Sequence, residues 1–71
     1  MPLVNIKVIE GVFSPEQKAE LVRNLTEAVI AVAGEKMRSV TWVLLDEVQS
    51  GDWAIGGQTL TTEAVRSLGK G

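Results

Sequence analysis

The chain of 71 residues contains no cysteine and no histidine. Without cysteine it can form no disulfide, and without either residue type it lacks the usual protein ligands of zinc. It also lacks the imidazole and the thiolate that most often act as base or nucleophile. The serines stand in cap or loop contexts without a base beside them. These absences exclude the common constellations of catalytic residues.

Basic runs and long apolar segments are missing as well. The net charge is −2, from 7 Lys and Arg against 9 Asp and Glu, and no cluster of positive charge stands out. Nucleic-acid phosphates require such clusters, so we expect no nucleic-acid partner. The first lysine is already at position 7, which leaves no room for the apolar core of a signal peptide or a membrane span. We therefore expect a cytoplasmic protein with no membrane partner.

Hydrophobic residues are abundant, at 45% of the chain. We expect a single domain over residues 1–71, and a domain of this length buries only about 60% of the surface that it exposes when unfolded. One small sheet with one helix cannot cover so many apolar side chains. The composition therefore predicts an assembly of several copies.

The first half of the chain predicts a strand followed by a long helix. Side chains alternate between two faces over Leu3–Ile9, which is typical of a strand. Ser14, Pro15 and Gln17 have the spacing of an N-cap, a first helical residue and a capping box, and Gly34 is a suitable stop. The apolar stripe that we expect between these signals consists of Val22, Leu25, Val29 and Val32, joined by Leu21 and Ala28.

The second half predicts another strand and a small hairpin. Residues Val40–Glu47 are apolar on both faces, so we expect the face away from the helix to meet another subunit or line a pocket. A helix between two strands predicts a right-handed β-α-β unit with parallel strands. Ser50–Gly57 is typical of a turn that leads into a hairpin, and Thr61–Leu68 of a short helix. The expected class is α/β (α+β).

Pro2 is the one unusual candidate for a catalytic base. A proline is tolerated at the first residue of a strand, where no partner needs its N–H, and that explanation alone is sufficient. If Met1 is removed, however, Pro2 becomes a secondary amine. Asp46 and Glu47 are not a promising carboxylate pair, because neighbours on a strand point to opposite faces.

Four segments in order resemble one known family. They are MP with a strand ending at Glu10-Gly11, the helix start SPEQKAEL, the strand VTWVLLDE and the segment GDWAIGG at 51–57. This order and spacing resemble the tautomerase superfamily, and within it the small 4-oxalocrotonate tautomerase group, over nearly the whole chain. The resemblance implies a tautomerase-like fold, a homohexamer built as a trimer of dimers, and catalysis by Pro2 after loss of Met1.

The chemistry implied by this resemblance is keto-enol isomerisation of a small conjugated carbonyl acid. A terminal amine has a reference pKa of about 8, and an apolar pocket lowers it by disfavouring the charged form. Neutral Pro2 could then take a proton from an enol hydroxyl and return it to carbon. Such a reaction requires no metal and no organic cofactor.

The chain departs from the family at two positions that matter for the substrate. Members that act on dicarboxylates have arginines where this sequence has Val12 and Trp42. Arg38, in the loop before the second strand, is either a replacement for them or a solvated arginine. Trp53 matches the hairpin aromatic of the family. We expect Trp53, Trp42 and Arg38 to contact the substrate in a pocket that is more apolar and less cationic than the family pattern.

Two alternatives remain open at this point. Hydration or dehalogenation of an unsaturated acid would need a protonated Pro2 and a carboxylate to activate water, for which Asp52 beside Trp53 is the nearest candidate. A turn aspartate usually serves the backbone instead. The other alternative is an inactive hexameric homologue, which the loss of both arginines favours.

Overall fold

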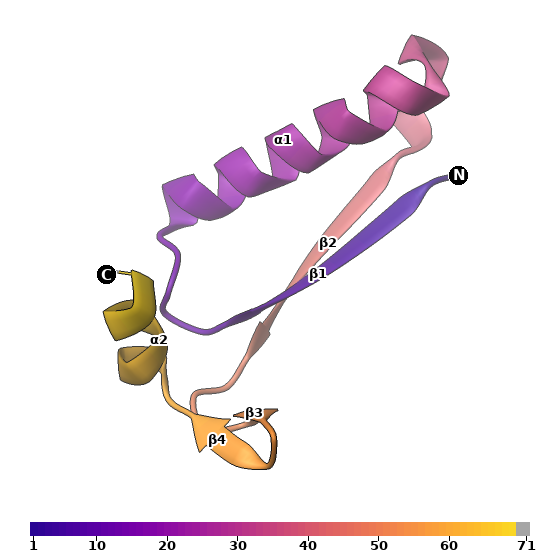
Figure 1. The fold of residues 1–71 in the computed structure, drawn as a ribbon. Helices are drawn as coiled ribbons and strands as arrows, with labels where there is room; N and C mark the ends of the chain where they lie inside the picture. The colour runs from indigo at the N-terminus through magenta and orange to yellow at the C-terminus, as the bar shows by residue number, and fades with distance from the viewer. Residues whose placement is uncertain (70–71) are drawn as a thin grey trace.

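A β-α-β unit forms most of the molecule in the computed structural model, which describes residues 1–69 (Figure 1). Its elements in chain order are β1 (Leu3–Ile9), α1 (Pro15–Ala33), the 3₁₀ helix η1 (Glu35–Val40) and β2 (Trp42–Val48). The two strands pair in parallel, with a register that runs from Leu3 opposite Trp42 to Ile9 opposite Val48. The predicted β-α-β unit is therefore confirmed.

The remainder is a hairpin followed by a short helix. The strands β3 (Trp53–Ile55) and β4 (Gln58–Leu60) pair antiparallel, and α2 (Thr62–Gly69) follows. The Thr61 hydroxyl accepts a hydrogen bond from the backbone N–H of Ala64 over 3.2 Å, so Thr61 caps α2. Figure 1 shows the hairpin and α2 together near the end of β1, at the opposite end of the molecule from the N-terminus.

Helix α1 begins and ends where the sequence predicts. The Ser14 hydroxyl accepts from the backbone N–H of Gln17, and the Gln17 side chain accepts from the backbone N–H of Ser14 over 2.9 Å. Gly34 caps the other end with φ of 101°, a backbone conformation that residues with a Cβ rarely adopt. The capping box and the glycine stop are thus confirmed.

The predicted start of the second strand is wrong by two residues. Val40 is the last residue of η1, and β2 begins only at Trp42. The Thr41 hydroxyl donates to the carbonyl of Met37 over 2.7 Å, and this bond keeps the chain in a helical turn. Pairing starts one residue later, where the N–H of Trp42 donates to the carbonyl of Pro2, the residue just before β1.

The predicted apolar stripe of α1 is only partly correct. Ile30, which the prediction omitted, is the most buried residue of the helix, whereas Val32 is 91% exposed. The helix carries two adjacent stripes, and the two-stranded sheet is too narrow to cover both. Leu25, Ala28 and Val32, at spacings of three and four residues, belong to the stripe that lines an open groove next to β1.

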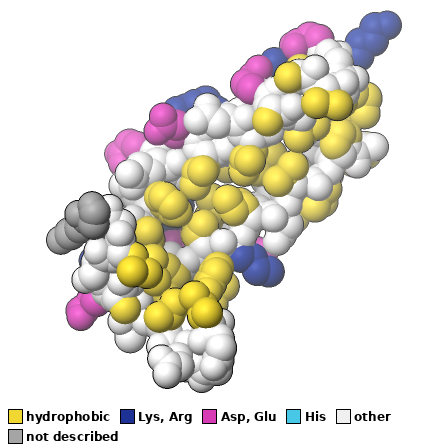
Figure 2. Space-filling view, viewed as in Figure 1, with side chains coloured by type: hydrophobic (Ala, Val, Ile, Leu, Met, Phe, Trp, Pro, Cys, Tyr) yellow, Lys and Arg dark blue, Asp and Glu magenta, His cyan; other side chains and the backbone are white. Residues whose placement is uncertain are grey.

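The core is small for the number of apolar residues. Within residues 1–69, the buried hydrophobic side chains are Val8, Ile9 and Ile30. Figure 2 shows hydrophobic side chains at the surface along the length of the molecule. The radius of gyration is 14.7 Å, against roughly 11 Å expected for a compact chain of this length. This elongated shape leaves apolar surface available for contact with other chains.

The face of the sheet that points away from α1 is apolar and open at its N-terminal end. Leu3, Trp42 and Leu44 lie there and are 57%, 52% and 42% exposed. Within residues 1–69, no helix combines the length and the apolar character needed to cross a membrane. A second apolar face on β2 was predicted from the sequence, and the structure confirms it.

Candidate active site

Pro2 lies just before β1 and is partly buried. Its carbonyl accepts the backbone N–H of Trp42 over 2.9 Å, which joins it to the first rung of the sheet. The proline also lines a groove of about 410 Å³ between β1 and α1. The other residues that line this groove are all apolar: Val4, Leu25, Ala28, Val29, Val32 and Ala33.

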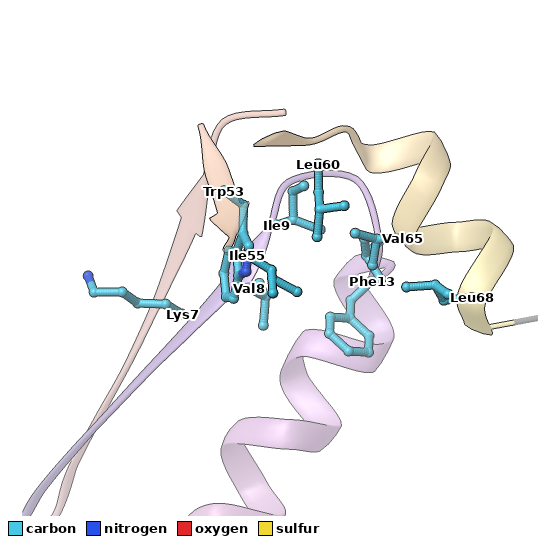
Figure 3. Close-up of a pocket in the computed structure, with 10 residues that line it drawn as sticks. Lys7, Val8, Ile9, Phe13, Trp53, Ile55, Leu60, Val65 and Leu68 are labelled. Carbon is cyan, nitrogen blue, oxygen red and sulfur yellow. The ribbon is translucent and has the colours of Figure 1, made fainter. Parts of the chain in front are cut away.

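Trp53 lines a different cavity, of about 330 Å³, at the other end of β1 (Figure 3). The walls come from the end of β1, the turn after it, the hairpin and α2. Apart from Lys7, they consist of apolar side chains: Val8, Ile9, Val12, Phe13, Trp53, Ile55, Leu60, Val65 and Leu68. Figure 3 shows the nitrogen of Lys7 directed away from the other labelled side chains. The cavity wall is therefore almost entirely apolar.

One chain does not bring Pro2 and Trp53 together. Pro2 precedes the first residue of β1, whereas the cavity of Trp53 is formed around Lys7, Val8 and Ile9 near the end of that strand. Val8 lies six positions after Pro2 along the extended chain, which corresponds to roughly 20 Å. A site that uses both Pro2 and Trp53 therefore needs more than one copy of the chain.

The backbone of Trp42 lies close to Pro2, but the side chain of Trp42 does not. Its N–H bonds to the Pro2 carbonyl, yet its indole lies on the outer face of the sheet beside Leu3 and Leu44. Pro2 lines a groove on the opposite face, under α1. Within one chain, the groove and the Trp42 indole are thus separated by the sheet itself.

Arg38 belongs to η1 and is held by two carboxylates. Its Nε lies 2.7 Å from Glu35 Oε1, and its Nη2 donates to Glu27 Oε1 over 2.9 Å. These hydrogen bonds lower the pKa of both glutamates and raise the pKa of Arg38. Four of the five N–H groups of Arg38 are thus in use, which leaves one for a substrate carboxylate.

Two further ion pairs fix the carboxylates of β2 on opposite faces of the sheet. Asp46 accepts from Asn5 over 2.9 Å and from Lys7 over 3.2 Å on the outer face, and both hydrogen bonds lower its pKa. Glu47 lies 2.7 Å from Lys18 of α1, whose hydrogen bond lowers the pKa of this glutamate. The opposite orientation predicted for these neighbours is confirmed.

Asp52 stands in the turn before the hairpin. Its backbone N–H donates to the carbonyl of Gln49 over 2.9 Å, and its side chain is exposed.

Among residues 1–69 no three His, Cys, Asp or Glu side chains gather as metal ligands would. Of the residues that line the Trp53 cavity, only Trp53 and Val12 were assigned to a pocket from the sequence. The helical spacing of Val65 and Leu68 was the available signal for the α2 wall.

Comparison with known proteins adds independent information. A family model described as tautomerase enzyme matches residues 2–63. A probable tautomerase of Campylobacter jejuni is 37% identical over 67 residues, which is 94% of each chain. Probable tautomerase K2 of Dickeya dadantii is 36% identical over 61 residues, which covers 86% of this chain and 90% of that protein.

Solved structures show the same similarity in three dimensions. A 4-oxalocrotonate tautomerase homologue is 39% identical with a TM-score of 0.73, covering 83% of this chain and 90% of its own. The heterohexamer 4-oxalocrotonate tautomerase of Chloroflexus aurantiacus is 36% identical with a TM-score of 0.74, covering 83% and 92%. Sequence and fold are therefore similar over the same large part of the chain.

Proposed function

Because this chain belongs to the tautomerase family, we propose that it is a cofactor-independent tautomerase with Pro2 as its general base. The substrate is a small conjugated carbonyl acid, which the protein interconverts between its enol and keto forms. The observation that supports this proposal most directly is the groove at Pro2, whose other lining residues are all apolar. Removal of Met1, which is 76% exposed, converts the Pro2 nitrogen from an amide into a secondary amine.

The chemistry follows from the surroundings of that amine. An apolar environment disfavours the protonated form, so part of the Pro2 population is neutral near neutral pH. The neutral nitrogen takes the proton of the enol hydroxyl while the C–O bond becomes a carbonyl. The electrons of the C=C bond then take a proton back from the prolinium, which forms a C–H bond and restores the base. The five-membered ring holds the lone pair in one direction throughout.

We propose further that the complete site forms in a homohexamer arranged as a trimer of dimers. The separation of Pro2 from the Trp53 cavity within one chain supports this, as does the exposed apolar face at Leu3, Trp42 and Leu44. Within residues 1–69, both strands of the β1-β2 sheet also have an unpaired edge, and such edges readily pair with another chain. Association would place Pro2 of one copy against the cavity of another.

The substrate of this site carries an aromatic or extended apolar group. Val12, where dicarboxylate-specific relatives have an arginine, lies in the apolar wall of the cavity together with Trp53. An apolar wall favours a flat hydrophobic group over a second carboxylate, because an unpaired buried anion is unfavourable. Trp53 supplies a broad surface for such a group. A monocarboxylic aryl enol fits these features.

The test is to measure ketonisation of phenylenolpyruvate by purified protein whose intact mass shows that Met1 is absent. In deuterated water, an enzymatic reaction delivers deuterium to one face of the carbon, whereas the spontaneous reaction uses both faces. We expect a rate above the buffer reaction together with one dominant stereoisomer of the product. A rate equal to that of buffer alone would support the inactive homologue instead.

A further inference from the structure

Arg66 of α2 lies against the turn that follows β1. Its Nε donates to the backbone carbonyl of Gly11 over 3.0 Å, and its Nη2 donates to the same oxygen. Gly11 has φ of 77°, and a Cβ added there would lie 3.6 Å from Arg66 Nη2, so the guanidinium sits directly over this turn. The next residue along the chain is Val12, which lines the Trp53 cavity. The guanidinium therefore lies beside the turn that supplies Val12 to the cavity wall, and we call this position the rim of the cavity.

The charge of Arg66 is not neutralised within residues 1–69. No carboxylate of this part of the chain lies within 4 Å of its guanidinium, although Glu63 precedes it by one helical turn. Arg38, by contrast, holds two carboxylates. The partner of Arg66 is a neutral carbonyl, which occupies two N–H groups and leaves others of the five available.

The other cations near this turn, Lys7 and Lys18, are already paired with carboxylates. Lys7 bonds to Asp46 on the outer face of the sheet, and Glu47 bonds to Lys18 below the turn. The Glu10 side chain accepts from the backbone N–H of Ser50 over 2.9 Å. Arg66 is thus the cation at the rim that has room for an anionic ligand.

We propose that Arg66 binds the carboxylate of the substrate and thereby determines specificity for monocarboxylic acids. It supplies from α2 a cation beside the turn that carries Val12. The aryl group of the substrate then enters the apolar cavity beside Trp53 while the carboxylate stays at the rim. Arginine suits this role because its planar N–H groups match the geometry of a carboxylate. This inference rests on the proposed tautomerase function.

The test is equilibrium binding rather than turnover. Phenylacetate, a monocarboxylate that cannot react, and its neutral analogue phenylacetamide are titrated against the intact assembly while tryptophan fluorescence is recorded. In the unmodified protein we expect phenylacetate to bind more tightly. Arg66→Ala should weaken phenylacetate binding by about tenfold or more, as expected for loss of a hydrogen bond to a charged group, with little change for phenylacetamide. Arg66→Lys should recover part of the loss.

Two control variants distinguish the effect of the Arg66 charge from its role in holding α2 against the turn. Thr62→Val removes the other bond between α2 and this turn, in which the Thr62 hydroxyl donates to the Glu10 carbonyl over 2.6 Å, but it leaves the charge in place. Arg23→Ala removes a positive charge from an exposed position of α1. Neither should change the preference for phenylacetate over phenylacetamide.

The inference is overturned if the unmodified protein binds both ligands equally. It is also overturned if Arg66→Ala leaves phenylacetate binding unchanged, or if Thr62→Val reproduces its effect on both ligands, because Arg66 would then only hold α2 in place. Repeating the titration with Pro2→Ala keeps the two proposals distinct. If that variant retains the discrimination while the parent shows no turnover, the proposed function fails and the assignment of Arg66 stands.

Discussion

The backbone N–H of Trp42 donates a hydrogen bond to the carbonyl of Pro2 over 2.9 Å. This bond extends the β1-β2 ladder by one residue beyond its paired strands and fixes the backbone of Pro2. The bond involves the carbonyl oxygen of Pro2, whereas the ring nitrogen takes no part in the hydrogen bonds of the sheet. The proline can therefore be replaced without removing any bond of the sheet, which makes it a clean position for a test of catalysis.

Pro2→Ala should retain the fold but lose at least about tenfold in ketonisation of an enol acid, the lower end of the effect of a positioned general base. A primary amine lacks the rigid ring and differs in basicity, whereas the bond from Trp42 persists. The assay follows the enol absorbance, with circular dichroism as the check on folding. Pro15→Ala, at the first position of α1, is the matched control and should leave the rate unchanged. An equal rate for Pro2→Ala and the parent would remove Pro2 from the mechanism.

Local signals in the sequence were sufficient to predict the main elements. The exchange of hydrogen bonds between Ser14 and Gln17, and the glycine at position 34, specify the ends of α1 by themselves. Alternation over Leu3–Ile9 likewise requires no tertiary information. The two errors arose where tertiary contacts decide. The start of β2 depends on which N–H meets a β1 carbonyl, and the burial of Ile30 rather than Val32 depends on how the helix lies over the sheet.

The candidate site was less accessible from the sequence for a different physical reason. Pro2 was singled out as the one unusual candidate base, and Trp53 and Trp42 by comparison with the family pattern, but the single chain places the three at separate surfaces. Contacts between copies have no periodicity or capping signature in a sequence. The position of Arg66 had no signature in the sequence either, because Arg66 comes close to Gly11 only after α2 folds back against the turn.

Association into a hexamer should depend on the outer face of the sheet. We expect static light scattering of the parent at micromolar concentration to give six times the mass of one chain. Leu44→Asp places a charge on this face and should lower the mass, since an unpaired charge is unfavourable in an apolar interface. Ala19→Asp adds the same charge on the exposed side of α1 and should not. A monomeric parent would contradict both the assembly and a site shared between copies.

Loss of the helix cap should destabilise the protein measurably. Ser14→Ala removes the hydroxyl that accepts the Gln17 N–H, and we expect a reduction of about 1 kcal/mol in the free energy of unfolding, the usual effect of such a cap. Urea unfolding at one fixed protein concentration measures this, because the stability of an assembly depends on concentration. Ser67→Ala in α2 is the control. A midpoint unchanged by Ser14→Ala would show that the cap contributes nothing.

The ion pair between Glu47 and Lys18 should make stability depend on pH in the acid range. In the folded protein, the hydrogen bond from Lys18 lowers the pKa of Glu47 below its ordinary value of about 4.5. The stabilisation of the folded protein by this ion pair is therefore fully present above pH 4.5 and is lost as the pH falls through the lowered pKa. Glu47→Gln should unfold at lower urea than the parent near neutral pH, and the difference should shrink on acidification. Glu20→Gln, on the exposed surface of α1, is the matched control. A difference that grows towards low pH would contradict this assignment.

Substrate preference should follow from the apolar wall at Val12 and Trp53. A dicarboxylate such as 2-hydroxymuconate brings a second charge, and an anion buried without a partner costs several kcal/mol. An aryl group instead gains contact with the indole, roughly 0.5 to 1.5 kcal/mol beyond the area that it buries. We therefore expect a higher kcat/KM for phenylenolpyruvate than for 2-hydroxymuconate, measured on protein whose mass shows Met1 absent.

Val12→Arg provides the converse experiment at the same wall. An arginine there gives the second carboxylate a partner for paired hydrogen bonds, so the ratio of the two kcat/KM values should shift towards the dicarboxylate. Val12→Met changes the size of the side chain without adding charge and should leave the ratio near that of the parent. A parent that already prefers 2-hydroxymuconate would mean that other cations, such as Arg38 and Arg66 from separate copies, meet both of its charges. The apolar wall would then shape the pocket without selecting the substrate.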